Sequence, residues 1–147
     1  MAYYYAYGVN LYLSHMREYC PGAEFLGPAH LPGHRLIFDG QSNRRPGATA
    51  NIREEKDQIV WGVLLKIGQK ELDELDKFEN YPISYLRKRV TVFSLTGLGY
   101  TNVWVYYRKG AVEGKPGTEY FSEVLAGARM CELPPYYIKD LEAVETL

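Results

Sequence analysis

The strand-forming and helix-forming segments of this 147-residue sequence do not alternate regularly. Short apolar runs predict strands at residues 3–7, 24–31, 35–39, 48–52, 58–67, 87–95 and 102–108. Apolar residues at helical spacing predict helices that begin at Asn10, Gln69, Thr118 and Pro134, with Asn10 and Thr118 as N-caps, and a polar loop is expected at residues 40–46. Because regular βαβ alternation is missing, we expect a single α+β domain over residues 1–147. Its sheet should be small, mixed or mostly antiparallel and barrel-like, with helices around it.

Composition and charge exclude several functional classes. The formal net charge is −1, which gives no electrostatic footprint for nucleic acid or an anionic membrane. The short basic clusters at residues 44–45 and 87–89 are interpreted as solvated faces or strand edges. No window approaches 18 apolar residues, and the first residues do not resemble a signal peptide. Cys20 and Cys131 form no metal or disulfide pattern, so we expect a cytoplasmic protein with reduced thiols.

The N-terminal strand leads through a glycine turn into a helix. Gly8 ends the tyrosine-rich strand, and the helix is expected from Asn10. Such a turn presents backbone N–H groups without partners and the positive end of the helix dipole. It can hold a carboxylate or a developing oxyanion without a charged side chain. Spacing alone leaves the alternative of an ordinary structural turn.

Glu79 occupies an unusual place at the end of the helix predicted for residues 69–79. On a wheel of 100° per residue with Leu72 at zero, Glu79 falls at about 340° and therefore between Leu72 and Leu75. An apolar surrounding and a helix C-terminus both disfavour the ionised carboxylate and would raise its pKa toward neutrality. This placement suits acid/base catalysis. The alternative is a frayed helix end with the side chain in water.

Other candidate groups lack the spacing that their chemistry needs. His15, His30 and His34 show no metal-ligand pattern, so no metal is expected. Ser14 and Ser94 lack the sequence context of an activated serine. These residues are interpreted as structural.

Several segments together resemble the γ-glutamylcyclotransferase family. The first, Y-Y-A-Y-G-V-N-L at residues 4–11, is similar to the family's Y-F-A-Y-G-S-N-L loop, and L-D-K-F-E-N at 75–80 is similar to its L-D-x-x-E-G. The other similar segments are C-P-G-A at 20–23, L-P-G-H-R-L at 31–36, V-W-G-V-L at 60–64, Tyr85, T-E-Y at 118–120, G-A-R at 127–129 and Leu133-Pro134. They follow the family order over nearly the whole chain.

The resemblance implies a barrel-like fold with a cavity between the N-terminal loop and the helix that carries Glu79. It implies an enzyme that converts a small γ-glutamyl compound to 5-oxoproline by intramolecular aminolysis, with Glu79 as catalytic acid/base and without a cofactor. The small-molecule substrate is the expected partner, and a homodimer is possible. The implied substrate-binding residues are Tyr4, Tyr5, Ala6, Tyr7, Gly8, Val9, Asn10, Tyr85 and Tyr120.

Two positions depart from the family pattern. Val9 stands where serine is usual, which removes a hydroxyl and leaves the backbone N–H. Asn80 replaces a glycine, and asparagine tolerates the left-handed conformation at a helix end, so the change is easily accommodated. Two alternatives stay open. One is a γ-glutamylamine cyclotransferase, whose relatives favour a Y-G-T-L loop, so Asn10 argues mildly against it. The other is a binding module in which Val9 marks lost catalysis.

Overall fold

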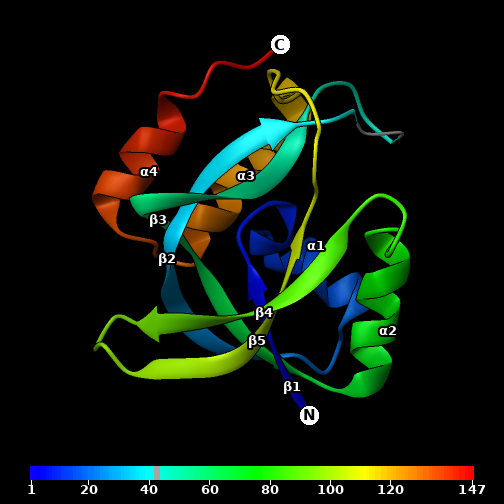
Figure 1. Cartoon of the computed structure of the whole chain (residues 1–147), viewed down its shortest axis with the longest axis vertical. Helices are drawn as coiled ribbons and strands as arrows, with labels where there is room; N and C mark the ends of the chain where they lie inside the picture. Colours follow the sequence, from blue (N-terminus) through cyan, green and yellow to red (C-terminus); the bar gives the residue numbers. More distant parts are fainter. Residues whose placement is uncertain (42–43) are drawn as a thin grey trace.

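Five strands form a closed barrel in the computed structural model, which describes residues 1–41 and 44–147 (Figure 1). The strands are β1 (Ala2–Ala6), β2 (Glu24–Asp39), β3 (Thr49–Ile67), β4 (Leu86–Ser94) and β5 (Gly99–Tyr107). Their order around the barrel is β1-β3-β2-β4-β5. All pairs are antiparallel except β1 with β5, which closes the barrel in parallel. The α+β, barrel-like architecture expected from the sequence is therefore confirmed.

Two long, bent strands replace four of the predicted short ones. The segments predicted at 24–31 and 35–39 are parts of β2, and those at 48–52 and 58–67 are parts of β3. The expected break at Pro32-Gly33 is an irregularity in the pairing, where the register jumps from Pro32 opposite Ile59 to His34 opposite Glu54 and Gly33 adopts a φ of 72°. The strand bends there without ending, as strands do at bulges. The predicted loop over residues 40–46 falls between these strands, and its residues 42–43 lie outside the described part.

Four α-helices and one 3₁₀ turn accompany the barrel within residues 1–41 and 44–147. They are η1 (Val9–Leu11), α1 (Leu13–Tyr19), α2 (Gln69–Phe78), α3 (Thr118–Met130) and α4 (Pro135–Glu142). Figure 1 shows α1 and α2 on one side of the barrel and α4 on the other. None of the helices in the described ranges has both the length and the apolar character that a bilayer crossing requires.

Both predicted N-caps are wrong. Asn10 lies within η1, and its buried side chain donates a hydrogen bond to the Tyr4 hydroxyl (2.8 Å) instead of capping a helix. The N-cap of α1 is Tyr12, and that of α3 is Gly117. A capping preference read from sequence considers only the bond between a side chain and the backbone of its own helix. Here both side chains form hydrogen bonds with other parts of the chain instead. The Thr118 hydroxyl bonds to the Leu147 carbonyl (2.7 Å).

Close backbone contact joins α3 to the η1 turn. A Cβ added to Gly127 on α3 would lie 2.4 Å from the carbonyl carbon of Leu11 and 2.5 Å from the backbone nitrogen of Tyr12. Only glycine leaves room for this approach. Helix α3 therefore packs directly against the chain segment that carries Gly8, Val9 and Asn10.

Candidate active site

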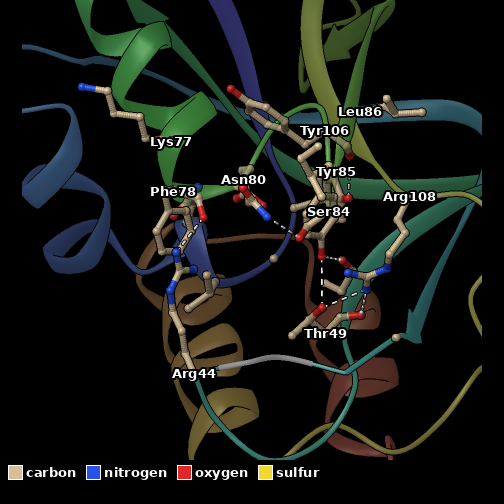
Figure 2. A pocket seen from close by; sticks show the side chains of 18 of the residues that line it. Arg44, Thr49, Lys77, Phe78, Asn80, Ser84, Tyr85, Leu86, Tyr106 and Arg108 are labelled. Carbon is tan, nitrogen blue, oxygen red and sulfur yellow. Dashed lines mark hydrogen bonds between the residues drawn. The ribbon is translucent and has the colours of Figure 1, made fainter.

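A cavity of about 810 Å³ lies where the η1 turn, the end of α2, the segment after it and the start of α3 meet the barrel. Figure 2 shows this cavity from close by. Among the site residues expected from the sequence, nine line it: Tyr4, Tyr5, Tyr7, Gly8, Val9, Asn10, Glu79, Tyr85 and Tyr120. Ala6 lies behind the wall, 1% exposed, with its carbonyl against Gly62. The barrel thus brings together segments that are up to 116 residues apart in the sequence.

Glu79 is the C-cap of α2 and is half-buried in the cavity wall. Its backbone N–H donates to the Leu75 carbonyl (2.8 Å), which fixes where the side chain leaves the helix. Burial raises the pKa of the Glu79 carboxyl from 4.5 to about 7, and the positive charges of Arg44 and Arg108 oppose that rise. No hydrogen bond or ion pair joins this carboxyl to another side chain in the described residues.

Asn80 turns the chain sharply after Glu79. Its φ of 53° lies in the left-handed region, which asparagine tolerates better than most residues. The Tyr81 N–H donates back to the Asp76 carbonyl (2.8 Å), and the Asn80 side chain bonds to the Ser84 hydroxyl (2.9 Å; Figure 2). The replacement of the family's glycine is therefore absorbed, and α2 ends with Glu79 directed at the cavity.

Three cavity tyrosines donate their hydroxyl protons to the barrel backbone. The Tyr5 hydroxyl donates to carbonyls of β2 and β3 (2.9 and 3.0 Å), and the Tyr7 hydroxyl donates to one of β5 (2.7 Å). The Tyr85 hydroxyl donates to a carbonyl of β3 (2.7 Å). These three hydroxyls position the rings and close the wall. They have no second proton to offer a ligand.

Tyr4 and Tyr120 differ from those three because their hydroxyls act as acceptors. Tyr4 accepts from the Asn10 amide (2.8 Å), and Tyr120 accepts from the Ala50 N–H (2.9 Å). Each retains a proton to donate. Burial raises the pKa of both phenols above the ordinary value, so both stay protonated at neutral pH. Tyr4 and Tyr120 therefore line the cavity with hydroxyl protons that no acceptor in the described residues takes up.

The glycine turn also presents donors. The backbone N–H groups of Val9 and Asn10 donate to no acceptor within the described residues, since the η1 bonds run from Leu11 to Gly8 and from Tyr12 to Val9. A Cβ on Gly8 would lie 2.9 Å from that of Ala50, so glycine permits the close approach of the turn to β3.

The cavity wall also holds a polar cluster, around Arg108, that no sequence pattern indicated. Arg108 donates through Nε and Nη2 to Asp39 Oδ1 (3.1 and 2.7 Å), and Nη2 also donates to the Thr49 hydroxyl (2.9 Å). Asn51 donates to the other Asp39 oxygen (3.0 Å), and the Arg108 guanidinium stacks over the Tyr85 ring at 4.5 Å. Figure 2 shows Arg108 directed toward Tyr85 and Thr49.

Arg44 and Arg45 line the cavity too. Arg44 is exposed, as expected for a solvated face, whereas Arg45 is half-buried, so that interpretation is wrong for Arg45. Arg44 lies 4.4 Å above the Phe78 ring and donates to the Phe78 carbonyl (2.8 Å; Figure 2). Arg45 forms a bidentate pair with Glu123 (2.8 and 3.0 Å). A short basic run carries no signal that distinguishes a cavity wall from a surface, because its location depends on the closed barrel.

Comparisons with known proteins agree with this architecture. The family model described as "Gamma-glutamyl cyclotransferase, AIG2-like" matches residues 4–123. Gamma-glutamylcyclotransferase of Bos taurus is 30% identical over 147 residues, covering 97% of this chain and 78% of the relative. The protein of that name from Homo sapiens is 28% identical with the same coverage. A solved structure named "Gamma-glutamyl cyclotransferase" superposes with a TM-score of 0.95 at 27% identity, covering 99% of this chain and 89% of that one.

The model match spans most of the chain, and the bovine relative is covered over more than two thirds of its length. Fold, cavity and motif order point the same way. The chain therefore belongs to the gamma-glutamyl cyclotransferase, AIG2-like family and is a cyclotransferase-type enzyme.

Proposed function

We propose that this enzyme cyclises the γ-glutamyl group of a γ-glutamyl-amino acid to 5-oxoproline, with Glu79 as the general acid and base. One observation carries the proposal. The Glu79 carboxyl lines the cavity without a side-chain partner in the described residues, and burial raises its pKa to about 7. A group with this pKa can both accept and donate a proton at neutral pH.

The reaction needs two proton movements at neighbouring nitrogens. The neutral α-amine of the substrate attacks its own γ-carbonyl carbon and forms the ring C–N bond. Ionised Glu79 accepts the proton that the attacking nitrogen loses. The protonated Glu79 then gives a proton to the leaving nitrogen as the original amide C–N bond breaks, so an amino acid and 5-oxoproline result. Holding both nitrogens near one carboxyl gives the proximity that an intramolecular reaction exploits.

The remaining cavity groups supply contacts for the bent substrate. The Tyr4 and Tyr120 hydroxyls have protons to donate to a carbonyl or carboxylate oxygen. The backbone N–H groups of Val9 and Asn10 would hold the α-carboxylate or the oxyanion that develops on the γ-carbonyl. Because these donors are backbone groups, they persist although Val9 lacks the usual hydroxyl.

The charge of the cavity favours an amino acid over a cationic amine as the leaving group. Five basic residues are among the described lining residues, and Glu79 is the single acidic one; the basic residues are Arg44, Arg45, Lys77, Arg108 and Lys109. Arg45, Lys77 and Arg108 also pair with acids outside the lining, so the positive excess is smaller than this count. The lining still offers more cations than carboxylates, which suits a leaving group with a carboxylate better than one that ends in an ammonium. This argues against a γ-glutamylamine substrate of the γ-glutamyl-lysine type.

We also place this activity in the cytoplasm. Cys20 and Cys131 are buried free thiols, and unpaired cysteines suit a reducing compartment.

The first test replaces the proposed acid/base by its isostere. Glu79→Gln keeps the volume of the side chain and removes the titrating group, so 5-oxoproline formation from γ-glutamyl-alanine should fall at least about 10²-fold. The matched control is Glu74→Gln on the same helix, where the carboxylate pairs with exposed Lys77 (3.1 Å) and does not line the cavity. Chromatographic detection of 5-oxoproline measures the rate.

Circular dichroism would establish that both variants fold. Undiminished turnover by Glu79→Gln would remove Glu79 from the mechanism. A different outcome is an unaltered protein that forms 5-oxoproline from none of γ-glutamyl-alanine, γ-glutamyl-lysine and glutathione and is still thermally stabilised by 5-oxoproline. That result would favour the alternative of a non-catalytic binding module.

A further inference from the structure

Arg108 is a cation that the fold fixes in the cavity wall. Its side chain is 15% exposed and that of Asp39 is 3% exposed, so the pair is shielded from water. Two guanidinium nitrogens contact Asp39 Oδ1 (2.7 and 3.1 Å), and Nη2 also donates to the Asp39 carbonyl (2.7 Å). Asn51 donates to the remaining Asp39 oxygen (3.0 Å). The orientation of the guanidinium is therefore set before any ligand arrives.

One guanidinium nitrogen stays available to the cavity. Nε and Nη2 of Arg108 make all the hydrogen bonds that this side chain forms within the described residues, and Nη1 makes none. Nη1 is not among the buried atoms that lack a partner, so its N–H groups are accessible. The guanidinium stacks on Tyr85 at 4.5 Å, a ring that also lines the cavity (Figure 2).

The other basic side chains of the lining are less suited to this task. Arg45 directs both terminal nitrogens to Glu123, and Arg44 stacks on Phe78 and bonds to its carbonyl. The Lys77 side chain is 75% exposed and pairs with an acid of its own helix, and Lys109 is exposed. Ammonium groups in water gain little from a second carboxylate.

Arg108 also lies within electrostatic reach of the reacting centre. Burial raises the pKa of the Glu79 carboxyl, and the Arg108 charge is one of two that pull this pKa back. A ligand that contacts Glu79 therefore occupies the field of Arg108 as well.

We propose that Arg108 binds a carboxylate of the substrate through Nη1 and determines specificity for it, with Asp39 as the residue that positions the guanidinium. The inference rests on the proposed function, since it assumes a γ-glutamyl substrate. A γ-glutamyl-amino acid offers two carboxylates, the α-carboxylate of the glutamyl group and that of the leaving amino acid. Arginine suits either because its planar fork matches carboxylate geometry.

The test removes both members of the ion pair together. Changing Arg108 alone would leave Asp39 buried without its cation, which is strongly destabilising. The double variant D39N/R108Q leaves the net charge unchanged and keeps an acceptor for Asn51. The matched control is Arg53→Met, which removes an exposed arginine that pairs with Glu55 and Glu113 and does not line the cavity.

Two ligand pairs identify the carboxylate. Calorimetric binding of 5-oxoproline and of its carboxamide reports on the α-carboxylate. Binding of γ-glutamyl-alanine and γ-glutamyl-ethylamide, measured in the inactive Glu79→Gln background, reports on the leaving-group carboxylate. We expect the protein with Arg108 to prefer the charged member of at least one pair by about tenfold or more. D39N/R108Q should lose that preference, and Arg53→Met should keep it.

Loss of preference in the first pair assigns the α-carboxylate, and loss in the second assigns the leaving group; either result supports the proposal. Equal preference in D39N/R108Q and the unaltered protein would overturn it, as would an unaltered protein that does not discriminate. If the double variant does not fold, the Nε–H NMR signal of Arg108 should shift with the charged member of at least one ligand pair and not with its uncharged partner, and a signal that never distinguishes them would overturn the proposal. Because these are binding measurements, they stand apart from failure of turnover, which would refute the proposed activity instead.

Discussion

At the residue scale, the burial of Glu79 gives the stability of the fold a pH dependence. The pKa of this carboxyl rises from 4.5 to about 7 because burial disfavours its charge. Below about pH 4.5 it is protonated in both the folded and the unfolded chain. As the pH rises toward 7, the unfolded chain releases its proton first, so the free energy of unfolding falls. The loss is roughly 3 kcal/mol, at about 1.4 kcal/mol per pKa unit.

Glu79→Gln should remove this pH-dependent loss. At pH 8 the variant should exceed the unaltered protein in free energy of unfolding by up to roughly 3 kcal/mol, and near pH 4.5 the two should be similar. Urea unfolding between pH 4.5 and 8.5 measures the difference, with Glu74→Gln as the exposed control. A difference that does not change with pH would contradict the buried, titrating carboxyl. If the difference grows with pH as expected, Glu79 serves catalysis at the expense of stability.

Single residues were predictable where their signal was local. Glu79 could be placed from the angular positions of its helix, and the glycine turn from adjacent letters. Asp39 and Arg108 carried no such signal, because they are 69 positions apart and meet only when the barrel closes. Their side-chain types are ordinary at a strand end, and nothing in spacing distinguishes them from a solvated pair.

At the scale of elements, the sequence located strands better than it divided them. Pro32-Gly33 looks like a turn because glycine and proline mark turns, yet the same residues also make bulges. Which of the two forms depends on whether the next segment continues beside the same partner. Here β2 keeps its pairing with β3 on both sides of the irregularity, from Glu24 opposite Lys66 to Asp39 opposite Thr49. That partner is set by barrel topology, which a local pattern does not encode.

The packing of α3 on the η1 turn yields a prediction at the same scale. Gly127→Ala would place a Cβ 2.4 Å from the backbone of Leu11, so the helix or the turn must move. Displacement of the turn shifts the Val9 and Asn10 donors, and we expect 5-oxoproline formation to fall about tenfold or more although Gly127 does not line the cavity. The melting temperature should also fall, since overpacking a core costs about 1–3 kcal/mol.

Gly114→Ala is the control for that substitution. Gly114 is exposed, and an added Cβ would make an ordinary contact of 3.7 Å with Ala48. Its stability and turnover should match the unaltered protein. A Gly127→Ala variant with normal kcat and KM would show that α3 does not hold the turn in place.

At the scale of the whole molecule, the cavity and the core are parts of one structure. Tyr4 and Tyr5 come from β1, which closes the barrel between β3 and β5, and Arg108 directly follows β5. The Tyr5 hydroxyl bonds across the interior to β2 and β3. The part of the wall that β1 supplies therefore cannot leave without opening the barrel. Cooperative unfolding is the expected consequence for one core of this size.

Unfolding should thus appear as one transition by every probe. Far-UV circular dichroism, fluorescence of Trp61 on β3 and Trp104 on β5, and loss of the cyclotransferase activity should share one urea midpoint, because site and barrel depend on the same strand pairs. Trp61→Phe leaves Trp104 as the single reporter and separates the two sides of the barrel. Since 5-oxoproline would bind only the folded form, a concentration of 100 times its dissociation constant should raise the free energy of unfolding by about 2.7 kcal/mol and move all midpoints together. Activity that disappears well before the strands unfold would instead mean that the cavity wall opens by itself.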